Sequence, residues 1–123
     1  GNPLAMAAGL ATLAVLRHSD YTALEHRVDV FVAELESILR GKGVPVQIPH
    51  IASMFTVYFT DAPLRDFAST QTVNRELFES FYKQMRERGV FLAPSAFEAS
   101  MVSFAHSDED FETALDAARS VSL

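Results

Sequence analysis

An almost unbroken apolar run, Leu4–Leu16, lies near the start of the chain and limits how this chain can fold. Pro3 suits the first position of a helix, and apolar residues recur at helical spacing over residues 3–17. Further apolar residues fill the remaining sides, so the predicted helix is apolar all round. Such a helix must be covered on every side. We expect the covering surface to lie outside this chain; the alternative is a central core helix of a compact domain.

Composition excludes several classes of protein. The apolar run is too short to span a bilayer and is interrupted by Gly9 and Thr12. A net charge of −6 without a basic cluster argues against nucleic-acid binding, and the absence of Cys removes disulfides and thiolate metal sites. Neither lysine, Lys42 or Lys83, lies in a setting that would tune a Schiff-base amine. The histidines lack metal-ligand spacing, so no metal site is expected; they are His18, His26, His50 and His106. We predict one soluble, cytoplasmic domain over residues 1–123.

The remaining pattern predicts an α+β fold with a small, mainly antiparallel sheet covered on one face by helices. A helix follows Ser19 or Asp20 and ends before Gly43. Its predicted buried stripe comprises Leu24, Val28, Phe31, Leu35 and Ile38. Residues 44–48 alternate like an edge strand, and Met54–Thr60 is the strongest strand prediction. Residues 61–73 are expected to form a surface connection with a helical turn near Leu64–Ala68. Further helices are predicted from Arg75 to Gly89 and after Ser107, which with Asp110 forms a variant capping box.

Residues 89–106 carry the candidate site. Two short strands are predicted, Val90–Leu92 and Met101–Phe104, joined by a loop that contains a single acid, Glu98. A carboxylate among apolar neighbours on a rigid loop is typical of a group that faces a site. The alternative is a solvated loop acid.

The run Gly-Val-Phe-Leu-Ala-Pro-Ser-Ala-Phe-Glu-Ala, residues 89–99, resembles the C-terminal domain of the glutamate-1-semialdehyde 2,1-aminomutase family. This family belongs to the class III pyridoxal-phosphate aminotransferase group. Three other stretches agree with the resemblance in the expected order, namely Gly1–Gly9, Ser53–Thr56 and Ala105–Asp110. The family commonly has Gly and Phe where this chain has Ser100 and Met101, so the surroundings of Glu98 differ.

The resemblance implies the C-terminal small domain of a fold-type-I enzyme. In full length, that enzyme converts glutamate-1-semialdehyde to 5-aminolevulinate in tetrapyrrole biosynthesis, using pyridoxal 5'-phosphate and its pyridoxamine form. The cofactor lysine lies upstream, so we expect no catalytic residue, no bound cofactor and no turnover in this chain alone. The partners implied are the enzyme's own large domain, on which residues 1–17 would pack, a second subunit in a homodimer, and the small-molecule substrate; a membrane is not among them. Glu98 matches the family's active-site glutamate, a substrate-binding residue, and Gly1 and Asn2 would lie beside the cofactor phosphate and the dimer interface.

Two alternatives remain. Another class III aminotransferase is disfavoured because residues 90–107 contain no Arg or Lys to clamp a substrate carboxylate. A non-catalytic α+β binding module is disfavoured because its first helix should present a polar face to water.

Overall fold

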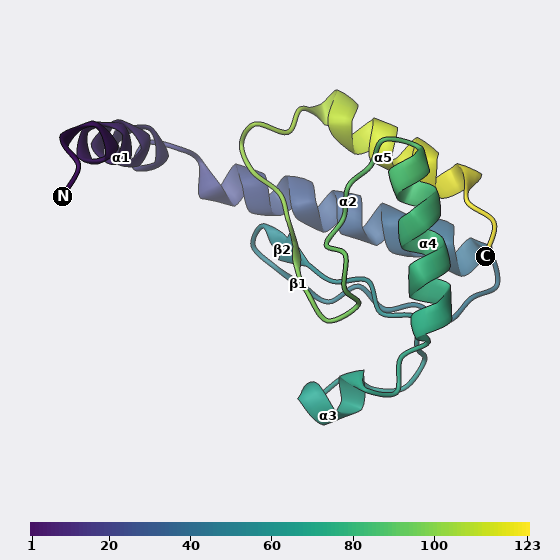
Figure 1. Cartoon of the computed structure of the whole chain (residues 1–123). Coiled ribbons are helices and arrows are strands. Elements are labelled where there is room, and N and C mark those ends of the chain that lie inside the picture. The colour runs from purple at the N-terminus through teal and green to yellow at the C-terminus, as the bar shows by residue number, and fades with distance from the viewer.

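Two helices, α2 (Tyr21–Gly41) and α5 (Asp108–Ser120), lie next to each other above a small sheet in the computed structural model, which describes all 123 residues (Figure 1). The sheet has three antiparallel strands in the order β1 (His50–Ile51), β2 (Met54–Phe55) and β3 (Ser100–Met101). A further helix, α4 (Arg75–Glu87), packs beside α5, and a one-turn helix, α3 (Phe67–Thr70), precedes it. The predicted α+β class, with helices on one face of the sheet, is confirmed.

The core lies between α2, the β1–β2 hairpin, α4 and α5. The α2 helix begins at its N-cap Asp20, whose carboxylate accepts from the Ala23 N–H at 3.0 Å. Its buried face runs the length of the helix and comprises Leu24, Val28, Phe31, Val32, Leu35 and Leu39. The predicted stripe included Ile38, which is only half-buried, and it missed Val32 and Leu39. The chain reverses after α2 at Gly43, whose φ of +79° favours glycine.

The hairpin keeps one register over more residues than its named strands. His50 pairs with Phe55, and Gln47 pairs with Tyr58 as an isolated bridge in the same register. Between them the Thr56 N–H donates to the Pro49 carbonyl, but Pro49 has no N–H to return the bond. The strand predicted over residues 44–48 is therefore reduced to the bridge at Gln47, with β1 lying after it, and the strand predicted over 54–60 is reduced to β2 and the bridge at Tyr58, because proline removes ladder bonds. The alternating burial is as expected, with Val46, Ile48, Phe55, Val57 and Phe59 buried.

Two strand predictions in the Glu98 region were wrong. Val90–Leu92 is extended but pairs with no strand, and the strand predicted over Met101–Phe104 is reduced to Ser100–Met101, paired with β2. The helical turn predicted near Leu64–Ala68 lies later, as α3. The predicted helix end at Gly89 is confirmed by its φ of +84°.

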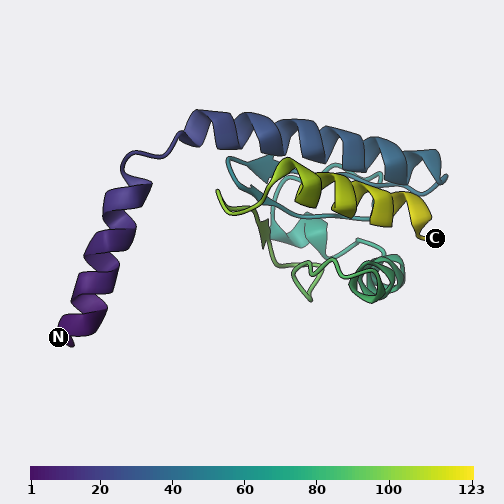
Figure 2. The same ribbon diagram turned by 90° about the horizontal axis from the view of Figure 1, so that it is seen from above.

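The first helix, α1 (Pro3–Leu16), contributes no side chain to the core. It begins as predicted with Pro3 in its first turn, and the Asn2 side chain accepts from the Leu4 N–H at 3.0 Å. None of its residues is buried, and Leu4 and Val15 are 77% and 70% exposed. Figure 2 shows α1 pointing away from the rest of the chain. A central core helix is therefore wrong for this chain. No helix combines the length and apolar character needed to cross a membrane.

Deleting residues 1–18 should change the free energy of unfolding of the remaining chain by no more than about 0.5 kcal/mol, because α1 buries nothing against it. Urea unfolding followed by circular dichroism would measure this. The truncated chain should also aggregate less, since five large apolar side chains of α1 are removed from water. If the truncation lowered the free energy of unfolding by more than about 2 kcal/mol, α1 would have to pack on the core in solution.

Candidate functional site

Serine side chains hold the Glu98 loop in a series of turns. The Ser95 hydroxyl accepts from the Phe97 N–H at 3.2 Å, and the Ser95 carbonyl accepts from the Glu98 N–H at 3.1 Å. At the ends of the loop the Ser100 hydroxyl accepts from the Ala93 N–H at 3.1 Å. Ser and Asn side chains commonly satisfy backbone donors in tight turns in this way. The loop therefore has a defined backbone on both sides of Glu98.

The residues before Glu98 anchor the loop to α3 and α4. Ala96 is buried, and the Arg75 guanidinium lies 4.8 Å from the centre of the Phe97 ring. The ring of Phe67, from α3, packs at a tilt against the Phe97 ring, with the two ring centroids 6.4 Å apart. Cation–π and aromatic contacts of this kind each contribute about 0.5–1 kcal/mol at exposed sites. Phe97 thus fixes where the next residue can point.

Glu98 itself is exposed, and its carboxylate makes no hydrogen bond or ion pair within the chain. Only its backbone is held, since its carbonyl accepts from the Thr56 hydroxyl of the hairpin at 3.4 Å. An exposed ionised carboxylate without a partner can accept several hydrogen bonds from donors outside the chain. The structure places Glu98 on a held loop at the surface, with its side chain available.

The outer face of the sheet next to this loop is apolar. Directly paired residues point to the same face, and the row of Ile51, Met54 and Met101 is 69%, 39% and 69% exposed. A shallow depression of about 280 Å³ lies on this side of the hairpin and reaches Ala99, the neighbour of Glu98. A surface with one free carboxylate beside apolar side chains suits contact with another protein surface or with a substrate held there.

Gly1 and Asn2 lie at the N-terminal end of α1, which points away from the rest of the chain (Figure 2). The Asn2 side chain is used to cap α1. This chain by itself therefore does not bring the three predicted site residues together.

Neither lysine is placed to hold an aldehyde cofactor. The Lys42 ammonium donates to the carbonyls of Arg119 and Val121, at 2.7 and 2.8 Å, and so satisfies the C-terminal end of α5. Lys83 is exposed on α4, and neither lysine lines the depression beside Ala99, the one beside β3 or the one between α2 and α5. The residues of this chain do not fit pyridoxal phosphate by themselves. No group of three potential metal ligands is found either.

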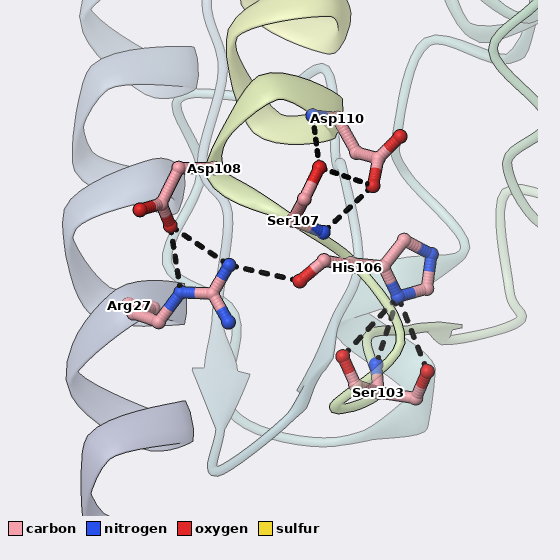
Figure 3. Close-up of polar contacts among 6 residues, drawn as sticks. All are labelled: Arg27, Ser103, His106, Ser107, Asp108 and Asp110. Carbon is pink, nitrogen blue, oxygen red and sulfur yellow. Dashed lines mark hydrogen bonds and ion pairs between the residues drawn. The ribbon is translucent and has the colours of Figure 1, made fainter.

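An arginine that the sequence analysis did not single out joins α2 to the end of the site segment (Figure 3). The Arg27 Nε donates to Asp108 Oδ1 at 3.0 Å, and Arg27 Nη2 forms an ion pair with the same oxygen at 2.9 Å. Arg27 Nη2 also donates to the His106 carbonyl at 2.9 Å. Its guanidinium also lies 4.8 Å from the centre of the Phe111 ring. The sequence placed Arg27 on a polar helix face, and a contact 81 residues away leaves no local signal.

The turn that precedes α5 is closed by its own side chains. His106 Nδ1 accepts from the Ser103 N–H at 3.0 Å, which gives this histidine a structural role (Figure 3). The predicted capping box is confirmed, since the Ser107 hydroxyl accepts from the Asp110 N–H and the Asp110 carboxylate accepts from the Ser107 N–H at 2.6 Å. The hydrogen bonds from the Ser107 N–H and hydroxyl, with the nearby His106 charge, lower the pKa of Asp110 below its ordinary value.

We expect Asp110 to make stability depend on pH. A carboxylate with a lowered folded-state pKa stabilises the fold above its unfolded value of 3.8, and this contribution is lost as pH falls through the lower folded-state pKa. At about pH 6 the Asp110→Asn variant should therefore unfold at a lower urea concentration than the unsubstituted chain. The difference between the two urea midpoints should narrow below pH 3.8. Glu109→Gln, whose side chain makes no hydrogen bond, is the control. A difference in urea midpoint that stays constant with pH would contradict a lowered pKa of Asp110.

The chain was compared with known proteins. No protein-family model matches it. It is 65% identical over all 123 residues to glutamate-1-semialdehyde 2,1-aminomutase of Nitratidesulfovibrio vulgaris strain DP4, and 58% identical over 121 residues to that of Desulfovibrio desulfuricans strain ATCC 27774. The chain spans 29% of the length of each of these relatives and corresponds to their C-terminal part.

Solved structures share the fold. An omega-transaminase from Sphaerobacter thermophilus, 25% identical, superposes on 97% of this chain with a TM-score of 0.84, over 27% of its own length. A transaminase with PLP bound, 19% identical, covers 96% of this chain with a TM-score of 0.74, over 26% of its own length. The predicted resemblance is confirmed: the whole chain matches the C-terminal part of aminomutases and has a fold found in transaminases.

Proposed function

We propose that this chain is the C-terminal domain of a glutamate-1-semialdehyde 2,1-aminomutase and acts within a longer, cytoplasmic protein. The observation that carries the proposal is 65% identity over every residue of the chain, although the chain spans only 29% of the matched enzyme. The matched region covers every residue of the chain and so includes residues 89–99, the loop that holds the free carboxylate of Glu98.

The full-length protein would convert glutamate-1-semialdehyde to 5-aminolevulinate, so that the amino group moves from one carbon of the substrate to the next. Pyridoxal phosphate, held by residues outside this chain, would supply the chemistry for moving that group. The chain's own contribution is to bind and orient the substrate and to exclude water. We therefore expect no turnover from residues 1–123 alone, because neither Lys42 nor Lys83 is free in a pocket.

Glu98 is the residue of this domain that we assign to the substrate. Its loop is fixed by Phe97 and by Thr56, and its carboxylate has no partner in the chain. In a site closed off from water, an unpaired carboxylate accepts strongly from a substrate ammonium or hydroxyl. The apolar row of Ile51, Met54 and Met101 would help to cover such a site.

The α1 helix supplies the interaction surface of the proposal. It has no buried residue and exposes apolar side chains on all sides, so the large domain and a second subunit of a homodimer would cover it. Gly1 and Asn2, at its start, would then lie beside the phosphate of the cofactor. A free-standing binding module would keep α1 in water, where its exposed leucines favour aggregation.

Another class III aminotransferase is the second candidate. Such enzymes would need a positive side chain to bind the carboxylate of a second substrate. Residues 90–107 offer none, and the two arginines that contact this segment already have partners: Arg75 lies over Phe97, and Arg27 binds Asp108 and the His106 carbonyl.

A chimera tests the proposal. In the N. vulgaris DP4 enzyme, the matching C-terminal part would be replaced by this chain, and 5-aminolevulinate formed from glutamate-1-semialdehyde would be measured. We expect product at a rate within about 10-fold of that enzyme, since 65% identity preserves the interface as a whole. The enzyme lacking its C-terminal part should be inactive. A folded chimera that binds the cofactor but makes no product, or that aminates an added 2-oxo acid instead, would contradict the proposal.

In the same chimera, Glu98→Gln should lower kcat/KM by roughly 10- to 100-fold, the range expected for losing one hydrogen bond to a charged group. The folded chain makes no use of this carboxylate, so the melting temperature should not change. Glu79→Gln, an exposed acid on α4 without a hydrogen bond, is the matched control and should leave both quantities unchanged. Unchanged kinetics for Glu98→Gln would remove Glu98 from the site.

A further inference from the structure

A slot of about 500 Å³ opens between β3 and the segment Gly89–Ala93, whose first residue lies in a left-handed turn with a φ of +84°. In Figure 1 the stretch that follows α4 and the stretch that leads up to α5 run beside each other, and the Ala93 N–H donates to the Ser100 hydroxyl across the space between them. The floor of the slot is aromatic: the Phe31 ring lies 5.7 Å from Phe55 and 5.0 Å from Phe111. The slot is therefore an opening in the sheet layer that exposes part of the core.

One side of the slot has an unpaired backbone. In the segment Gly89–Ala93 the Val90 N–H donates to the Met85 carbonyl, but the N–H groups of Phe91 and Leu92 have no acceptor in the chain. The carbonyls of these residues receive no hydrogen bond either. Backbone groups alternate between the two sides of an extended chain, so the Phe91 N–H faces the same side as that of Ala93, toward β3.

The other side of the slot is the open edge of β3. The Val102 N–H donates to the Ser53 carbonyl at 2.9 Å, which makes that pair and the Phe55–Ser100 pair the hydrogen-bonded ones. The Met101 N–H and carbonyl consequently point away from β2, into the slot. Two unpaired edges, those of Phe91 and Met101, thus face the same space.

The polar side chains of the slot are already engaged. The Ser100 hydroxyl accepts from Ala93, His106 Nδ1 accepts from Ser103, and the Asp110 carboxylate accepts from Ser107. Apart from Thr113, which also lines the slot, the side-chain atoms left without a partner are His106 Nε2 and the second Asp110 oxygen, and all of these lie on or just before α5, away from the backbone of Phe91 and Met101. An extended polypeptide, by contrast, brings both donors and acceptors for two strand edges and apolar side chains for the aromatic floor.

We propose that the slot receives a short extended segment of the full-length protein, from outside residues 1–123, which pairs with the backbone of Phe91 and Met101. The inference rests on the proposed function, since it requires a longer chain. The matched relatives support that source, because about 70% of their length lies outside the part that this chain covers. The three residues Val90–Leu92, before the Ala93–Ser100 hydrogen bond closes the slot, offer an edge of roughly 10 Å, enough for about three residues of extended chain.

Hydrogen exchange of individual amides in the full-length protein tests the inference without any substitution. The Phe91 and Met101 amides should exchange about two orders of magnitude more slowly than unprotected amides, as paired strand amides do. Leu92, whose N–H faces away from the slot, should exchange faster than both and serves as the internal control. The Tyr58 amide, paired with Gln47, gives the protected reference. Phe91 and Met101 amides that exchange as fast as Leu92 would overturn the proposal.

Filling the slot with a side chain of the domain itself should remove the protection of the Phe91 and Met101 amides from exchange. Ala114→Phe puts an aromatic side chain into the slot from α5, and we expect exchange at Phe91 and Met101 to rise by about 10-fold or more. Glu109→Phe places the same side chain on the same helix outside the slot and should leave exchange unchanged. No change with Ala114→Phe, in a protein that keeps its other protected amides, would overturn the proposal.

A cross-link identifies the occupant. The chain has no cysteine, so Phe91→Cys can carry a thiol-reactive benzophenone, read against the same protein without the substitution. We expect cross-links to a segment of the same polypeptide outside residues 1–123; cross-links only between two copies would overturn that assignment. Formation of 5-aminolevulinate is measured on the same sample: activity without protection overturns the slot proposal alone, and protection without activity overturns the proposed function alone.

Discussion

The buried face of α2 is the surface on which the rest of the domain assembles. Its fully buried residues, among them Val28, Leu35 and Leu39, extend over the length of a 21-residue helix. The hairpin covers this face with every second side chain, and α5 and α4 complete the enclosure. Large core side chains of this kind each contribute a few kcal/mol, far more than any of the surface ion pairs. The position of the Glu98 loop follows from this packing, because both its ends lead into elements that α2 holds.

Local polar contacts then set the direction of the site segment. Phe97 is held by Arg75 and Phe67 at one end, and the turn at His106 is held by Arg27 at the other. Between them, Glu98 is left without a partner, and so are the backbone edges of Phe91 and Met101. With the exposed apolar α1, these are the groups that the chain does not satisfy by itself. They suit a domain that completes its surface against other parts of a longer protein.

The helices could be predicted from the sequence because their signals are local. Capping residues such as Asp20 and Ser107, left-handed glycines and apolar residues at helical spacing lie within a few positions of one another. The strands could be predicted only as alternating burial. Pairing depends on a distant partner: Pro49 interrupts one ladder, and Val90–Leu92 has the composition of a strand without a neighbour to pair with. Arg27 was missed for the same reason, since its partner is 81 residues away.

By itself the sequence determined the fold class, the presence of an unsatisfied apolar helix, the absence of a usable Schiff-base lysine, and Glu98 as the acid to consider. These depend on residue type and near neighbours, which the sequence states directly. Only the tertiary structure decided that α1 buries nothing, that the Glu98 carboxylate has no partner, and that an aromatic-floored slot lies between two unpaired edges. The physical reason is that exposure and pairing are relations between segments far apart in the chain, and packing against α2 settles which of those segments meet.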